Sequence, residues 1–171
     1  MNYLGKETTF QWLGHATFLV ETPSGRKVLF DPWLGNPSCP EEFQSPEEVD
    51  LILLTHGHFD HVADVIPQAT KHGCRVVCNV EMAFWLKKMG LPEDQVVEMN
   101  KGGSIEICGL RVTMTDAKHS SSVEVDGVLQ YGGEPAGFVI ETENEFRFYY
   151  AGDTCVFSDM ALISELYSPT L

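Results

Sequence analysis

The sequence predicts a layered α/β domain, and two observations support this prediction. Segments that alternate apolar and polar residues, as antiparallel strands do, lie near both ends of the chain, at 7–31 and 104–151. Between them, at 49–99, short apolar runs alternate with segments of helical spacing. Strand blocks on either side of such a section are typical of sheets packed together with helices outside. The length of 171 residues suits one domain over residues 1–171, or most of one.

The first elements are expected to be two or three antiparallel strands over residues 7–31, around a Pro-Ser-Gly turn. His15 interrupts one of these strands with a polar ring. It is either an ordinary hydrogen-bonded histidine or a residue of a functional site. Residues 32–48 contain four prolines, so they predict a long loop over one edge or mouth of the fold.

The middle of the chain is expected to alternate strands and helices. Residues 49–55 form a continuous apolar run, which is typical of a central strand buried on both faces. Residues 61–71 shift to helical spacing, and His72 beside the following glycine is interpreted as a C-terminal cap. Three more elements follow: a strand at 74–79, a helix at 80–90 with lysines in its last turn, and a strand at 95–99.

The C-terminal part is expected to return to strands. These strands cover 104–108, 110–117, 137–142 and 146–151, with a hairpin turn at 143–145. Residues 158–168 predict a final helix, and Ser158 is its expected N-cap because a serine hydroxyl can accept from a free backbone amide of the first turn.

Composition excludes several classes of protein. The formal net charge of −14 opposes unaided binding of nucleic acid or of anionic membranes. The N-terminus lacks the pattern of a signal peptide, and no apolar run reaches the ~18 residues of a membrane span, so a soluble cytoplasmic protein is expected. The five cysteines form no Cys-x-x-Cys pair and are interpreted as buried or free thiols.

The segment "THGHFDH" at 55–61 is the strongest chemical signal in the sequence. In an extended segment, residues two apart point to the same side, so His56 and His58 can present both rings to one metal ion. A tight turn into a helix at Val62 can aim Asp60 and His61 at a second ion beside the first. The alternative is a polar loop whose side chains are solvated or cap the following helix.

Two more candidate ligands follow predicted strands. His119 comes directly after the strand at 110–117, where ligands of α/β sheets gather, and it opens the "HSSS" loop. Asp153 follows an aromatic strand that ends in Ala-Gly, whose small residues let the backbone approach a ligand closely. The carboxylate of Asp153 can bridge two metals, and its alternative is an ordinary Gly-Asp turn.

The stretches "WLGHATFLVET", "LFDPWLGNP", "THGHFDH", "AKHSSS", "GGEPAGFVIE" and "YYAGDT" together resemble the metallo-β-lactamase superfamily. Within it, they resemble the predicted metal-dependent hydrolases related to ascorbate-6-phosphate lactonases. The resemblance implies an αββα sandwich with the metal site at one edge between the sheets. It also implies a first metal held by His56, His58 and His119, and a second held by Asp60 and His61, with Asp153 bridging both.

The resemblance further implies a hydrolase in which a metal-bound hydroxide attacks a small ester, lactone or phosphoester. Asp60 is then a catalytic residue that orients the hydroxide. Two zinc ions are the expected cofactors, with manganese, iron or nickel as alternatives, and their charge suits a small anionic substrate. His15, Asp31 and Ser120 are candidates for substrate contact or for support of the ligands.

This sequence departs from the family pattern at its C-terminal end. Relatives continue into another strand and a final histidine that completes the second metal, whereas this sequence ends at "YSPTL". The expectation is therefore a C-terminally incomplete fold that lacks its final strand and helix region. A homo-oligomer, or association with a chain that supplies the missing part, is the expected partner arrangement. Two alternative functions remain: a non-catalytic or split-enzyme subunit, and an iron-dependent oxidoreductase.

Overall fold

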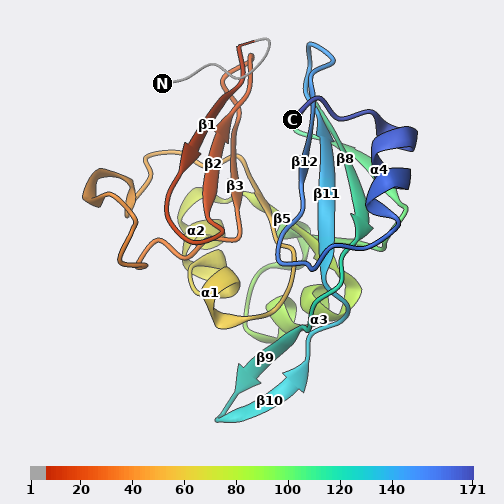
Figure 1. Ribbon diagram of the computed structural model, residues 1–171. Coiled ribbons are helices and arrows are strands. Elements are labelled where there is room, and N and C mark those ends of the chain that lie inside the picture. Colours follow the sequence, from red (N-terminus) through yellow and green to blue (C-terminus); the bar gives the residue numbers. More distant parts are fainter. Residues whose placement is uncertain (1–6) are drawn as a thin grey trace.

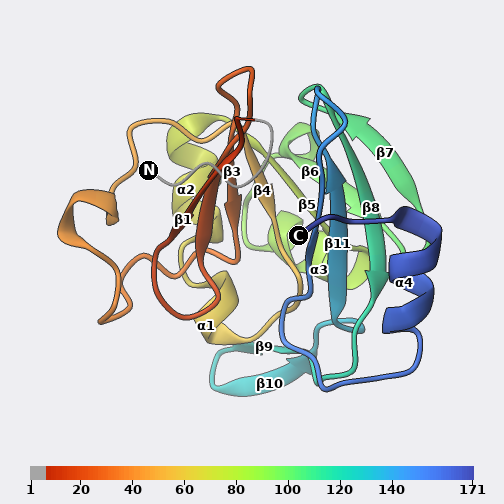
Figure 2. The same ribbon diagram turned by 45° about the horizontal axis from the view of Figure 1, so that its top comes forward.

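The computed structural model describes residues 7–171, which fold into two facing sheets with helices on the outside (Figures 1 and 2). The first sheet has the order β1-β2-β3-β4-β5-β6, and the second has the order β12-β11-β8-β7. The strands of the first sheet are β1 Thr9–Trp12, β2 Phe18–Glu21, β3 Lys27–Phe30, β4 Leu51–Leu53, β5 Arg75–Asn79 and β6 Val96–Met99. Those of the second are β7 Ser104–Ile107, β8 Leu110–Asp116, β11 Ala136–Glu141 and β12 Arg147–Tyr150.

Four α-helices cover the outer faces of the two sheets. They are α1 Phe59–Val62, α2 Val65–His72, α3 Val80–Lys88 and α4 Met160–Tyr167, with short 3-10 turns η1 Glu41–Phe43 and η2 Glu93–Gln95. Figure 2 shows α1, α2 and α3 beside the first sheet and α4 against the second. This is the αββα sandwich expected from the resemblance.

The central strand β4 is buried on both faces, as its apolar run predicted. Leu51 and Leu53 belong to the apolar cluster between the two sheets, which also contains Phe138 of β11. Ile52 lies in a second cluster, between the first sheet and its helices. This division follows from the strand itself, because successive side chains point to opposite faces.

The pairing of the first sheet changes along its width. The β1, β2 and β3 strands pair antiparallel, which confirms the prediction for residues 7–31, and β3 to β6 pair parallel. Parallel strands end at the same edge of a sheet, so the residues that follow β3, β4 and β5 come together there. The proline-rich residues 32–48 leave this edge as a loop that carries only η1, as predicted.

Two helix boundaries differ from the prediction. The helix expected over 61–71 is two helices, and the first begins at Phe59 rather than at Val62. The second ends at His72, but the cap is Gly73 in the left-handed conformation with φ of 62°. The His72 side chain is not the cap, because its Nε2 is buried without a hydrogen-bond partner.

The N-cap prediction for the last helix is wrong. The N-cap of α4 is Asp159, without a side-chain capping bond, and the Ser158 hydroxyl donates instead to Asp159 Oδ1. The first amides of the helix are satisfied by backbone carbonyls, since Met160 N donates to Phe157 O and Ala161 N to Ser158 O. The side chain of Ser158 is therefore not needed as a cap.

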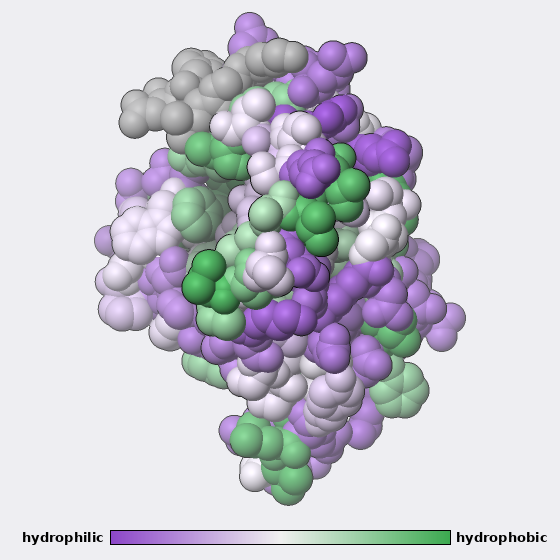
Figure 3. Space-filling view, turned by 45° about the vertical axis from the view of Figure 1, so that its right-hand side comes forward, coloured by the Kyte–Doolittle hydropathy of each residue, from purple (hydrophilic) through white to green (hydrophobic). Residues whose placement is uncertain are grey.

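A hairpin that was not predicted from the sequence lies between β8 and β11 of the second sheet. It consists of β9 Ser122–Val125 and β10 Val128–Tyr131, joined by Asp126 and Gly127 with φ of 53° and 76°. Positive φ at both central residues is the conformation of a two-residue hairpin turn, for which Asp-Gly is a strong signal. Figure 1 shows this hairpin projecting below the sheets, and Figure 3 shows apolar side chains at the lower tip of the molecule.

Residues 7–171 contain no helix that is both long and apolar enough to cross a membrane. All five cysteines are free, as expected from their spacing. Three are buried, Cys108 is half-buried and Cys155 is exposed.

Candidate metal centre

The loops at the carboxyl ends of four strands bring most of the predicted site residues together. Asp31 follows β3, His56 follows β4, His119 follows β8 and Asp153 follows β12. Three groups of His and Asp side chains there have ligand atoms within 4.8 Å of one another. They are His56, His58 and His119; His15, His61 and Asp153; and Asp31, His56 and His61.

The first group corresponds to the three histidines predicted for the first metal. His56 Nε2 lies 3.0 Å from His58 Nδ1, and the ring centroids of His56 and His58 lie 5.2 and 5.1 Å from that of His119. Two nitrogens bound to one tetrahedral zinc ion at about 2.0–2.1 Å lie roughly 3.3 Å apart. The His56–His58 separation is close to this value, and a ligand atom of His119 lies within 4.8 Å of both rings' ligand atoms.

Hydrogen bonding fixes the tautomer of His56. The Thr55 hydroxyl lies 2.7 Å from Asp31 Oδ2 and 3.0 Å from His56 Nδ1. Its single proton goes to the carboxylate, so the hydroxyl oxygen accepts from His56 Nδ1–H. The lone pair of His56 is then on Nε2, the nitrogen that faces His58. Thr55, which the sequence reading did not select, thus orients a ligand.

A hydrogen bond to Asp31 likewise fixes the tautomer and the orientation of His61. The fully buried Asp31 has a φ of 42°, and its Oδ2 accepts from His61 Nδ1 at 2.8 Å. The same carboxylate accepts from Thr55 N and lies 3.0 Å from the Tyr150 hydroxyl. His61 Nε2 is left buried without a hydrogen-bond partner. A lone pair held in this way is what a metal ion needs, so these residues fit the cofactor implied by the resemblance.

Asp153 lies between the two groups of histidines. Its Oδ2 is 3.5 Å from His61 Nε2 and 3.6 Å from His119 Nε2. Two hydrogen bonds join the loops that carry Asp153 and His119, because Cys155 N donates to Lys118 O and Lys118 N donates to Thr154 Oγ1. The carboxylate is therefore placed where it can contact ions on both sides.

The side chains of Asp60 and His61, both predicted for the second metal, leave α1 in different directions. Because α1 begins at Phe59, Asp60 and His61 are consecutive helical residues, whose side chains point about 100° apart. His61 is buried, and Asp60 instead pairs with His15, with Oδ2 2.9 Å from Nε2. His15 itself is not in a strand, because β1 ends at Trp12 and β2 begins at Phe18.

Ser120, the remaining candidate for substrate contact or for support of the ligands, lies against a metal-site histidine. Its hydroxyl is 3.3 Å from His58 Nε2, the nitrogen that faces away from His56. The side chains of His15, Asp60, His119 and Asp153 are each about one-third exposed, between 35% and 39%. One side of the centre is thus open to small molecules.

The buried histidines have shifted pKa values in the metal-free protein. Burial and, to a smaller extent, the charge of the neighbouring His61 lower the pKa of His56 to about 4. For His61, burial also lowers the pKa, but the hydrogen bond to Asp31 and the charges of Asp31 and Asp153 raise it overall. His56 is therefore neutral, as a metal ligand must be, well below neutral pH.

The shift of His56 predicts an acid-sensitive fold. Between pH 6.5 and 4 the unfolded chain binds a proton at His56 that the folded protein excludes, so the free energy of unfolding decreases as the pH is lowered through this window. The loss is about 3 kcal/mol in total, with a slope near 1.4 kcal/mol per pH unit. His61 adds no slope there, because its raised pKa removes stability only at higher pH. Urea unfolding should show a steeper slope for the metal-free wild-type protein than for the His56→Asn variant, which keeps a slope of the same sign because the pKa values of His58 and His72 are also lowered by burial. Equal slopes in the two proteins would contradict the assignment.

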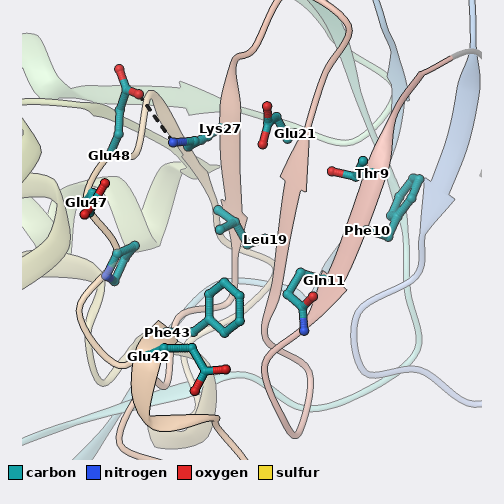
Figure 4. Close-up of a pocket in the computed structure, with 11 residues that line it drawn as sticks. Thr9, Phe10, Gln11, Leu19, Glu21, Lys27, Glu42, Phe43, Glu47 and Glu48 are labelled. Atoms are coloured by element: carbon teal, nitrogen blue, oxygen red, sulfur yellow. Dashed lines mark hydrogen bonds and ion pairs between the residues drawn. The ribbon is translucent and has the colours of Figure 1, made fainter. Parts of the chain in front are cut away.

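A separate groove lies away from the histidines. Figure 4 shows it between the outer face of β1 to β3 and the loop that carries η1, with a volume of about 330 Å³. Its floor includes Leu19 and Phe43, and Lys27 pairs with Glu48 at its rim. None of the predicted metal ligands lines this groove, so it is not the centre where the chemistry is expected.

An αββα sandwich with a histidine and aspartate centre at the carboxyl ends of its strands defines the class of metallo hydrolases with the metallo-β-lactamase fold. Residues 26–170 match the model of the Beta-lactamase superfamily domain. The chain belongs to this superfamily and, within it, to the UPF0173 metal-dependent hydrolases.

Two relatives illustrate the similarity of sequence. A UPF0173 metal-dependent hydrolase of Roseiflexus sp. (strain RS-1) is 46% identical over 175 residues, which cover 100% of this chain and 72% of the relative. One from Rubrobacter xylanophilus is 49% identical over 166 residues, covering 96% of this chain and 68% of the relative. The chain thus spans about 70% of the length of these relatives.

Similarity to a solved structure supports the same class. Igni18, a metallo hydrolase from the hyperthermophilic archaeon Ignicoccus hospitalis KIN4/I, superposes with a TM-score of 0.78 at 31% sequence identity. The match covers 94% of this chain and 66% of Igni18.

Proposed function

We propose that this protein is a dinuclear, zinc-dependent hydrolase of a small ester, lactone or phosphoester. The observation that carries the proposal is the arrangement of two adjacent groups of ligand atoms with the Asp153 carboxylate between them. Three imidazoles are a normal ligand set for a catalytic zinc ion, which leaves a coordination position open. Sites with two adjacent metals are typical of hydrolytic enzymes.

Each side chain has a defined task in this proposal. His56, His58 and His119 would hold the first ion, and Asp60 and His61 would contribute to the second, with Asp153 shared between the two. Bound metal ions supply Lewis-acid polarisation of a carbonyl or phosphoryl oxygen and lower the pKa of water. Asp60, about one-third exposed at the open side, would also orient the attacking water.

A small anionic substrate fits the charges around the centre. The cations on the neighbouring loops are already paired, since Lys118 and Lys101 both contact Asp116. Lys101 also pairs with Glu134 at 2.9 Å. The bound ions are thus the main positive charge available to a substrate in a protein of net charge −14.

Removal of a first-metal ligand tests this function. We expect His56→Asn to lower kcat/KM by at least about 1,000-fold, because the variant loses the ion that polarises the substrate. Turnover of a nitrophenyl ester, a lactone and a bis-nitrophenyl phosphate is measured after chelation and again after zinc is restored. His72→Asn, at the far end of α2, is the matched control and should keep wild-type turnover.

Other outcomes would favour the alternative functions. Turnover that is indifferent to the loss of His56 or Asp60 would contradict the hydrolase proposal. One ion per chain without turnover would favour a non-catalytic or split-enzyme subunit. Bound iron with oxidation of a substrate would favour an oxidoreductase on the same fold.

A further inference from the structure

We infer that His15 is a ligand of the second metal ion, which is then held by His15, Asp60, His61 and Asp153. This inference rests on the proposed dinuclear centre and adds to it a ligand outside the "THGHFDH" segment. From the sequence alone, His15 is expected only to contact substrate or to support the metal ligands.

The distances place His15 among the donors of the second position. A ligand atom of His15 lies within 4.8 Å of those of His61 and Asp153, in a group of three that excludes Asp60. Asp60 lies next to this group, because its Oδ2 is 2.9 Å from His15 Nε2. Two donors of one zinc ion lie roughly 3.3 Å apart, so a small rotation of the two side chains lets both bind the same ion.

A buried atom without a partner points into this position. His61 is fully buried, its Nδ1 is bound to Asp31, and its Nε2 has no hydrogen-bond partner. A buried polar atom without a partner is costly, and an ion at this position satisfies it. With His15, the position has two imidazoles and two carboxylates, which balance the charge of a divalent ion and provide four ligands.

The protein holds His15 in place by its backbone and its ring. Its carbonyl accepts from Trp12 Nε1 at 2.8 Å, and its φ of 50° is a left-handed conformation that is uncommon outside glycine. The ring packs edge-on against the rings of Trp33 and His61, with centroids 5.7 and 5.1 Å away. A strained backbone conformation that is maintained by the surrounding contacts is typical of functional sites.

The proline-rich loop fixes the turn that carries His15. Asn36 of this loop donates through Nδ2 to Leu13 O at 2.9 Å and to Trp33 O at 2.5 Å. Gly14 lies so close to Asn36 that a Cβ at this glycine would be 2.1 Å from Asn36 Oδ1. The loop over residues 32–48 therefore places His15 beside the metal position, which gives this loop a task in building the centre.

Metal binding by a variant without the imidazole tests the inference. In His15→Asn, asparagine tolerates the left-handed backbone but provides no ring. Zinc content after equilibrium dialysis and the visible spectrum after cobalt substitution are compared with wild type and with His72→Asn. We expect two ions per chain in wild type and in the control. In His15→Asn the first ion should bind within about threefold of wild-type affinity, and the second at least tenfold more weakly.

A measurement on the wild-type protein covers the case in which the variant does not fold. In protein labelled with 15N-histidine and loaded with 113Cd, we expect five of the six histidines to show a bond to cadmium, with His72 as the exception. Four bonded histidines, with His15 free, would overturn the inference, and so would a His15→Asn variant that binds both ions as wild type does. A protein that binds both ions through His15 but does not hydrolyse would overturn the proposed function alone.

Discussion

Replacing Asp31 by asparagine is expected to lower the free energy of unfolding of the metal-free protein by about 3–5 kcal/mol. The fully buried carboxylate accepts from Thr55 N, from the Thr55 hydroxyl and from His61 Nδ1. In asparagine, one of the two acceptor oxygens is replaced by an NH2 group, which is a donor and would face the donor groups of Thr55 or His61. It also removes the charge that keeps the pKa of His61 raised. Breaking a buried charged network usually costs this much, because the remaining partners lose their bonds in a dry environment.

The same variant should also weaken metal binding. Loss of the bond to Nδ1 frees the His61 ring to turn and to change tautomer, so we expect affinity for the second ion to fall by about 10–100-fold. Urea unfolding and competition with a zinc chelator measure the two effects. Asp50→Asn is the matched control, because Asp50 also accepts two hydrogen bonds, from Arg26 and from Lys27 N, but lies outside the centre. If the two variants lost equal stability and equal zinc affinity, the hydrogen bonds of Asp31 would contribute no more to the fold and to the metal centre than those of Asp50.

Replacing Gly57 by alanine is expected to cost about 1–3 kcal/mol of stability and to weaken the first metal site at least tenfold. A Cβ at Gly57 would lie 2.8 Å from Val123 Cγ1, 2.9 Å from Met82 Sδ and 2.9 Å from Ser122 O. The carbonyl belongs to the backbone of the β9–β10 hairpin and cannot turn away. The strain must therefore move either the hairpin or the segment between His56 and His58.

Gly35→Ala provides the comparison for this substitution. A Cβ at Gly35 meets no atom within 4 Å, so the change should leave both stability and zinc affinity close to wild type. Thermal unfolding with and without zinc, together with chelator competition, separates the two variants. If Gly57→Ala bound zinc as Gly35→Ala does, the close packing of the hairpin would have no influence on the ligands.

Much of the architecture was predictable because the apolar pattern, the turn residues and the helix caps of most segments indicate the same local structure. The run at 49–55 alternates between two apolar environments, and it forms a strand covered on both faces. The turn at 23–25 and the helix before Gly90 carry turn and cap signals that match their structure. The β9–β10 hairpin is not among the predicted strands, although Asp126-Gly127 is a strong turn signal.

The metal centre was predictable in its residue types but only partly in its arrangement. His56 and His58 converge because an extended chain places residues two apart on one side. The separation of Asp60 from His61 depended on where α1 begins, and that start lies three residues before the predicted one. Thr55 and Tyr150 gave no sequence signal, since their contact with Asp31 exists only once β3, β4 and β12 are assembled.

The sequence by itself determined the class of fold, the family and the set of chemical groups, because strand and helix periods and the spacing of "THGHFDH" are local properties of the chain. The tertiary structure alone decided how those groups meet. It buried Asp31 against His61, placed Asp153 between two groups of histidines and set His15 against Asp60. The physical reason is that these contacts join loops from separate strands, so their distances depend on the packing of two sheets and not on any neighbouring residue.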